Sequence, residues 1–259
     1  MADEEVLYEK RGHYAVLTMN RPERLNAQGA GMRKRFDEIM DDFDADPNMR
    51  AGILTGNGRA FSAGMDLREA AERANRGESV ATVRRGGVPR LWFSQSPKPW
   101  IAAINGLALG AGLERALDCD IRIMSTEAYV GLFEVRRGIL AGYAIHHLPR
   151  VTSLSAASQV LLLGEQVSPE QALQWGIVTE VLPPDRLMPR AIEMAETVAR
   201  NAPLSVQGTK SMIQAWRMAK IDDSYRLSEW LSKPVTESED IKEGARAFAE
   251  KRDPVWKGR

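Results

Sequence analysis

The sequence lacks the features that would tie it to nucleic acid, to a membrane surface or to an oxidising compartment. Its 35 Lys and Arg residues equal its 35 Asp and Glu residues, so the formal net charge is zero. The sequence therefore lacks the excess of positive charge that would indicate nucleic acid or an anionic membrane as a partner. Cys119 is the single cysteine and cannot form an internal disulfide, which fits a reducing compartment.

Long apolar runs are also missing. The longest, residues 100–113, contains Asn105 and is interrupted by glycines, whereas a membrane span needs about 20 apolar residues. The first ten residues, MADEEVLYEK, are acidic and lack the apolar centre of a secretory signal. We therefore expect a cytoplasmic protein, and the 259 residues fit one large domain or one domain with a small appendage.

Apolar periodicity predicts an α/β core followed by helices. The expected strands are 6–8, 14–19, 51–55, 100–104, 121–125, 129–131 and 177–181. The expected helices are 31–44, 112–118, 154–163, 169–175, 187–200, 204–219 and 225–231, and 66–85 is polar, helix-compatible and expected to be mobile. Strands alternate with helices as far as Val181, and only helices follow.

A glycine-rich turn near the middle of the chain carries the clearest chemical signal. Residues 100–120 read WIAAINGLALGAGLERALDCD, an apolar strand, a glycine turn and the start of a helix that contains Glu114. A second carboxylate, Glu134, follows twenty residues later in FEVRRGILAG. A glycine turn leaves backbone N–H groups free to bind an oxygen. Two glutamates beside such donors can move protons around an activated carbonyl compound.

Five segments, in order along the chain, share a further pattern. They read NRPERLNA, FSAGMDL, IAAINGLALGAGLE, FEVRRGILAG and AFAEKRDPVWKGR. Together they resemble the crotonase superfamily, the family of enoyl-CoA hydratases and isomerases. The resemblance implies a spiral of β-β-α units over 1–198, with the active site, and a C-terminal helical region over 199–259 for trimerisation and pocket closure. It implies an acyl-CoA thioester as substrate, no metal, and no cofactor beyond the coenzyme A of the substrate.

By this resemblance, the backbone N–H groups of Met65 and Ala111 form an oxyanion hole for the thioester oxygen. Met65 follows the turn of Ala63 and Gly64, and Ala111 lies between two glycines at a helix start. Two such donors can hold the enolate-like charge that develops beside a thioester, and the loss of one typically costs a few kcal/mol of barrier. The alternative is that both loops are ordinary turns between a strand and a helix.

Glu114 and Glu134 fall on the positions that hold the two acids of hydratases in this family. Glu114 is expected to act as base toward a water, and Glu134 to deliver a proton to Cα of a 2-enoyl thioester. At least one of them then needs a raised pKa, through burial or mutual repulsion. Alternatively, Glu114 is only a glutamate favoured by the helix dipole, and Glu134 only an ion-pair partner of Arg136 or Arg137.

Two departures from the family pattern stand beside these acids. Arg115 takes a place where a small or apolar residue is expected. Residues 138–150, GILAGYAIHHLPR, replace a glycine-rich turn that helps to close the water side of the site. Gly142 is expected to keep the backbone role of that turn, and Tyr143, His146 or His147 to reshape the pocket or add a polar contact. For the two histidines, the alternative that we favour is a position on the surface of an amphipathic helix.

The resemblance also implies residues that bind CoA. Backbone groups hold the adenine and pantetheine, and basic side chains meet the phosphates; singly, each basic residue is equally explained as a solvated surface charge. The expected CoA-binding residues are Glu23, Arg24, Leu25, Ala63, Asp66, Leu67, Arg68 and Lys251.

Three apolar residues either line the acyl pocket or pack in the core, and we favour the core for them: Leu91, Trp92 and Phe93.

The sequence therefore predicts an enoyl-CoA hydratase that adds water reversibly and syn to a 2-enoyl-CoA. One alternative is an isomerase, or a dehydratase of a functionalised acyl-CoA. An alternative of another class is an acyl-CoA-binding protein without catalysis. A homotrimer or a dimer of trimers is the expected assembly.

Overall fold

The computed structural model describes residues 4–76, 91–137 and 140–218, and in the C-terminal region residues 233–234, 237–240, 243, 247, 250 and 252–259. The strands are β1 (Val6–Arg11), β2 (Tyr14–Met19), β3 (Ala51–Gly56), β4 (Ala60–Ser62), β5 (Trp100–Ile104), β6 (Leu107–Leu109), β7 (Ile121–Ser125), β8 (Val130–Gly131) and β9 (Glu180–Leu182). The α-helices are α1 (Ala30–Ala45), α2 (Leu67–Asn75), α3 (Ala111–Asp118), α4 (Ala144–His147), α5 (Leu154–Leu163), α6 (Pro169–Gln174), α7 (Pro184–Arg200) and α8 (Pro203–Met218). Short 3-10 helices are η1 (Pro22–Arg24), η2 (Glu134–Arg137) and η3 (Leu148–Arg150).

Two sheets form the centre of the fold. The larger has the order β1-β2-β3-β5-β7-β9, and the smaller has the order β4-β6-β8. Among the strands that the structure describes, β1 and β2 pair antiparallel, with Val6 opposite Met19, and the other strand pairs are parallel. Each strand of the smaller sheet follows directly on a strand of the larger one, and α2 and α3 follow β4 and β6. The chain thus repeats β-β-α units, which confirms the predicted fold class.

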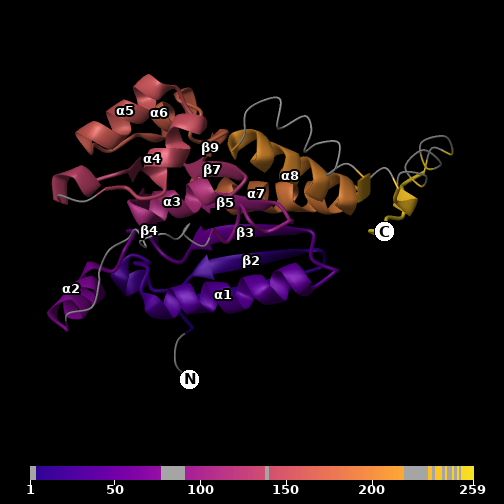
Figure 1. Ribbon diagram of the computed structural model, residues 1–259, viewed down its shortest axis with the longest axis horizontal. Coiled ribbons are helices and arrows are strands. Elements are labelled where there is room, and N and C mark those ends of the chain that lie inside the picture. Colours follow the sequence, from indigo (N-terminus) through magenta and orange to yellow (C-terminus); the bar gives the residue numbers. More distant parts are fainter. Residues whose placement is uncertain are drawn as a thin grey trace.

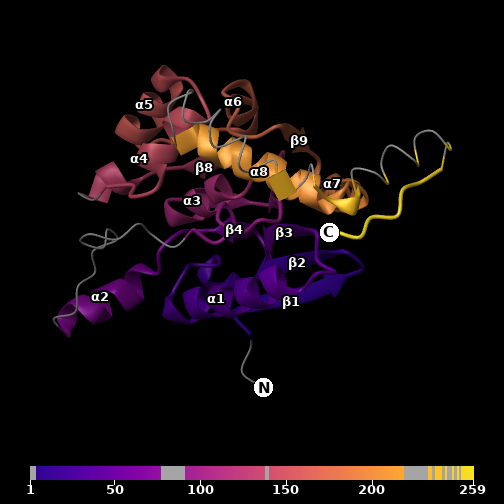
Figure 2. The same cartoon turned by 45° about the vertical axis from the view of Figure 1, so that its right-hand side comes forward.

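The larger sheet is covered on both faces. Alternate residues of β2 divide between two apolar clusters: Leu17 packs in the cluster that contains α1 and α3, and Val16 packs in the cluster that contains α7. Helix α7 contacts β2, β3, β5 and β7. In both views, α1 lies at one end of the molecule and α5 and α6 at the other, with α3 between them (Figure 1, Figure 2). Parallel strands buried on both faces are typically continuous apolar runs, as β5 is.

Most predicted elements that fall within the described residues are confirmed, and the main differences concern strands. Strands β4 and β6 were not predicted, because each has three residues inside a loop rich in glycine. The strand predicted over 177–181 is wrong in its bounds: β9 begins at Glu180, and Ile177 and Val178 are buried in the core before it. β1 continues to Arg11. The predicted helix 225–231 lies outside the described residues.

The described part of the chain holds no helix that is long and apolar enough to span a membrane. Cys119 is a free thiol and is buried. Leu91, Trp92 and Phe93 pack in or against the core, in agreement with the interpretation we favoured.

Candidate active site

Two glycines explain how α3 approaches the smaller sheet so closely. Gly110 joins β6 to α3 with a φ of +52°, a conformation that favours glycine. A Cβ on Gly110 would lie 2.9 Å from Oε1 of Glu134. A Cβ on Gly112 would overlap the carbonyl oxygen of Ser62 in β4. The first turn of α3 is therefore pressed between β4 and Glu134.

The two predicted oxyanion donors belong to neighbouring turns. Gly64 has a φ of +92°, and a Cβ there would lie 2.6 Å from the Leu109 carbonyl oxygen and 3.1 Å from the Ala111 nitrogen. Gln28 and Met65 form a parallel β-bridge, whose hydrogen bonds are donated by the N–H groups of Gln28 and Asp66. The bridge therefore does not use the N–H of Met65. Ala111 is the first residue of α3, so its N–H has no acceptor within the helix.

Glu114 lies one turn into α3 and is held by the start of α4. Its Oε1 accepts the N–H of Tyr143 at 2.8 Å and the N–H of Ala144 at 3.0 Å. These two bonds fix the orientation of the carboxylate. The sequence did not predict this role for Tyr143 and Ala144, although backbone donors at the start of a helix are a general site for a carboxylate.

Glu134 begins η2, and its half-buried side chain has a different environment. Its Oε2 is buried, and no described residue offers it a hydrogen bond. Burial raises the pKa of Glu134; the charge of Glu114 raises it further, while the backbone N–H of Glu134 and Arg137 act in the opposite direction. The alternative interpretation of Glu134, an ion pair with Arg136 or Arg137, is not found among the described residues: Arg136 instead lies over the Phe133 ring, with its Cζ 5.6 Å from the ring centroid.

The raised pKa has a consequence for stability. Between the ordinary value of 4.5 and the raised value, the folded state binds more protons than the unfolded state, so the wild type loses stability as the pH rises through this window. Glu134→Gln cannot ionise. We therefore expect the free energy of unfolding of Glu134→Gln, relative to wild type, to increase with pH across this window, as measured by urea denaturation at several pH values. A difference that stays constant with pH would contradict the burial argument.

For the residues after Gly142, neither a position in the pocket nor a position on the surface describes all of the side chains. Tyr143 is buried, its ring stacks on His147 with the centroids 3.7 Å apart, and burial raises its pKa. His146 is exposed, as the surface interpretation expects. That interpretation is wrong for His147, which is half-buried; burial lowers its pKa to about 4, and Arg217 and Arg150 add to this effect.

The segments predicted to bind CoA are brought together. Leu25 ends η1 with a φ of +52°, and its carbonyl accepts the N–H of Ala63 at 2.8 Å. Arg21 and Arg24 each donate to Oδ2 of Asp66 at 3.1 Å. The sequence did not predict Arg21, because it lies two residues before Glu23, the first of the expected CoA contacts.

Asp66 joins this cluster to α2. Its Oδ1 accepts the N–H groups of Arg68 and Glu69, both at 3.2 Å, which is the bonding of a helix N-cap. Burial alone would raise the pKa of Asp66, but the N–H of Glu69 and the two arginines outweigh it and lower the pKa. The side chains of Leu67 and Arg68 are exposed. Glu23 lies in η1, and Lys251 is outside the described residues.

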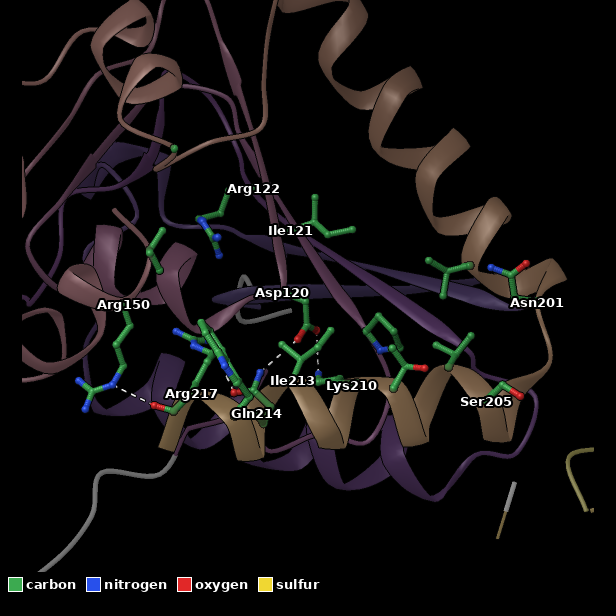
Figure 3. Close-up of a pocket in the computed structure, with 17 residues that line it drawn as sticks. Asp120, Ile121, Arg122, Arg150, Asn201, Ser205, Lys210, Ile213, Gln214 and Arg217 are labelled. Atoms are coloured by element: carbon green, nitrogen blue, oxygen red, sulfur yellow. Dashed lines mark hydrogen bonds and ion pairs between the residues drawn. The ribbon is translucent and has the colours of Figure 1, made fainter. Parts of the chain in front are cut away.

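A cavity lies elsewhere in the described part of the structure. It has a volume of about 690 Å³ and is bounded by the starts of β5 and β7 and by α8. Figure 3 shows Lys210 and Gln214 of α8 directed toward Asp120, and Lys210 forms an ion pair with Asp120 at 2.8 Å. None of the residues predicted for the active site lines this cavity. Among the described residues, no cluster of His, Cys, Asp and Glu is placed to hold a metal ion.

The fold and site define a class: an α/β spiral of β-β-α units in which two glycine turns and two glutamates converge. Comparison with known proteins supports the same class. The chain belongs to the enoyl-CoA hydratase/isomerase family, whose model matches residues 9–259.

Individual relatives match along almost the whole chain. The (E)-benzylidenesuccinyl-CoA hydratase of Thauera aromatica is 39% identical over 255 residues, 98% of this chain and 99% of that protein. The carnitinyl-CoA dehydratase of Citrobacter koseri is 36% identical over 266 residues, 99% of each. The crystal structure of enoyl-CoA hydratase from Mycobacterium tuberculosis H37Rv matches with a TM-score of 0.90 and 36% identity, covering 99% of this chain and 100% of that one.

Proposed function

We propose that this protein is an enoyl-CoA hydratase that adds water reversibly and syn to a 2-enoyl-CoA and forms a 3-hydroxyacyl-CoA. The observation that carries the proposal is the contrast between two neighbouring carboxyl groups. Glu114 is fixed by two backbone donors. Glu134 is half-buried and has a raised pKa, and its buried Oε2 has no hydrogen-bond partner among the described residues. Pairs of carboxyl groups with different environments suit one base and one acid.

The chemistry follows from these roles. Glu114 accepts a proton from the attacking water, whose oxygen bonds to Cβ of the enoyl thioester. Electrons of the C=C bond move toward the carbonyl oxygen, where the N–H groups of Met65 and Ala111 stabilise the developing charge. Glu134 then gives its proton to Cα. The proton on Glu114 must return to Glu134 before the next turnover.

Water chemistry is favoured over isomerisation because an isomerase can work with a single acid–base group, and here two are present. The related proteins include one named as a hydratase and one named as a dehydratase, which are the two directions of the same reaction. The alternative of an acyl-CoA-binding protein without catalysis differs by predicting binding without turnover.

The test is hydration of a series of trans-2-enoyl-CoA thioesters, from crotonyl-CoA to long chains, followed by the loss of enoyl absorbance. Turnover of at least one member of the series is expected, and the series gives the preferred chain length. Binding of CoA esters with no turnover of any member would contradict the proposal and favour the binding protein.

The proposal includes a homotrimer or a dimer of trimers, with the region 199–259 serving assembly and pocket closure, and needs no cofactor besides the CoA of the substrate. Light scattering of the purified protein measures the assembly. A mass of three or six chains is expected, and a monomer would contradict this part of the proposal.

A further inference from the structure

Arg115, the residue after Glu114, is a largely buried cation on an aromatic ring. Its side chain is 15% exposed, and its Cζ lies 4.4 Å from the centroid of the Trp92 ring. Trp92 is itself fixed, because its Nε1 donates to Asp37 at 2.6 Å and its ring packs against Phe36. A guanidinium over an indole is a stable arrangement that leaves the N–H groups at its edge free to bind.

Within the part of the chain that the structure describes, the charge of Arg115 is only weakly compensated. Its Nε donates to Oε1 of Gln28 at 3.3 Å, and its Nη1 forms a long ion pair with Oδ2 of Asp118 at 3.6 Å. Asp118 already accepts the N–H of Phe93 at 3.1 Å, and the N–H and hydroxyl of Ser94 at 3.3 and 2.5 Å. A guanidinium has five N–H donors, and a buried charge without full hydrogen bonding is costly.

Arg115 also lies beside the predicted oxyanion donors. Gln28, its hydrogen-bond partner, pairs with Met65 through the backbone, and its Nε2 donates to the carbonyl oxygen of Ala111 at 3.2 Å. Ala111 and Arg115 are four residues apart on α3 and therefore share a face of the helix. An acyl group that leaves the thioester along this face of α3 meets the guanidinium within about one helical turn.

We propose that Arg115 determines specificity by binding a carboxylate on the acyl group, so that the preferred substrate is a 2-enoyl-CoA whose acyl chain ends in a carboxylate. This inference rests on the proposed hydratase function. A carboxylate bound by the guanidinium fork forms two parallel charge-assisted hydrogen bonds and supplies the missing counter-charge. A plain hydrocarbon chain covers the same cation without compensating it, which costs binding energy.

The experiment compares matched substrates. Each pair has the same number of carbons and the same 2-enoyl thioester, with the far end of the acyl group a methyl or a carboxylate: 2-hexenoyl-CoA against 2-hexenedioyl-CoA, and the corresponding pairs with longer chains. For wild type we expect kcat/KM to be about tenfold or more higher for the diacid thioester of at least one length. A ratio between two substrates is insensitive to partial unfolding of the enzyme.

The variants assign that ratio to Arg115. Arg115→Met is expected to lower kcat/KM for the diacid thioester by roughly tenfold to a hundredfold and to leave the methyl-ended substrate within a few-fold. Arg115→Lys keeps a cation over Trp92 but lacks the fork, so an intermediate preference is expected. Lys34→Met, which removes an exposed charge from α1, is the control for net charge and should keep the wild-type ratio.

The outcomes separate the two claims. If wild type turns over no substrate of either kind, the proposed function is wrong and this inference is wrong with it. If wild type hydrates the methyl-ended thioesters at least as well as the diacid thioesters at every length, the hydratase stands and the role of Arg115 is overturned. An equal loss of both substrates in Arg115→Met, with no change of ratio in Arg115→Lys, also overturns it.

Discussion

Replacing Glu134 with glutamine lowers the rate of hydration by about a hundredfold or more, and Glu114→Gln has an effect of the same size. Each amide keeps the shape of the side chain but can no longer take up or release the proton that the proposed mechanism moves. Because the two groups act in one proton transfer sequence, the double variant should be little worse than either single one. The measurement is kcat for hydration of the best enoyl-CoA of the series.

A matched control is available in the same part of the chain. Glu127 is exposed in the loop between β7 and β8, so Glu127→Gln should keep wild-type activity. Circular dichroism should show all three variants folded. If Glu114→Gln or Glu134→Gln retains activity within about threefold of wild type, that carboxyl group is not an acid or base of the reaction.

The pH dependence of the hydration rate follows from the protonation of Glu134. The proposed mechanism needs Glu134 protonated for hydration, so the rate falls as the pH rises through its raised pKa. Because burial is the first cause of that shift, the falling limb lies above the ordinary carboxyl range. The limb is expected in the pH profile of wild type and absent from the residual activity of Glu134→Gln.

The second large effect is expected at a residue that has no side chain. Gly64→Ala places a Cβ 2.6 Å from the Leu109 carbonyl oxygen and 3.1 Å from the Ala111 nitrogen, so the turns that carry Met65 and Ala111 must separate. Loss of one oxyanion donor typically lowers kcat by about 100-fold to 1,000-fold. We expect a loss in this range, with CoA ester binding affected less.

Gly12→Ala is the control for the backbone cost. Gly12 also has a positive φ, +57°, but a Cβ there has no neighbour within 4 Å. Both variants carry a conformational penalty of roughly 1–2 kcal/mol, which thermal denaturation detects. Only Gly64→Ala should lose activity. Full activity in a folded Gly64→Ala enzyme would show that these turns do not form the oxyanion hole.

The long elements could be predicted because their apolar pattern is strong. In α1, for example, the apolar residues at helical spacing are all buried. Strands β4 and β6 escaped prediction because three residues are too few for a period, and their pairing with each other and with β8 depends on contacts far along the chain. The apolar character of Ile177 reflects core packing rather than a strand, which is why the start of β9 was misplaced.

In the site, too, features with local spacing could be predicted and contacts between distant segments could not. The glycine turns beside Glu114 were predictable, since their spacing is local. The bonds from Tyr143 and Ala144 to Glu114 were not, because that segment departs from the family pattern and lies 29 and 30 residues away. A pKa raised by burial or repulsion was expected for at least one of the two acids, and burial is the first cause of the raised pKa of Glu134. The alternative, an ion pair with the arginines that follow it in η2, does not form among the described residues.

The most direct test of the central claim is to incubate wild type with its best 2-enoyl-CoA in water enriched in ¹⁸O and to examine the product by mass spectrometry. The account predicts a 3-hydroxyacyl-CoA with one ¹⁸O atom on C3, which disappears in Glu114→Gln and Glu134→Gln. A product of unchanged mass with a shifted double bond would identify an isomerase and contradict the account.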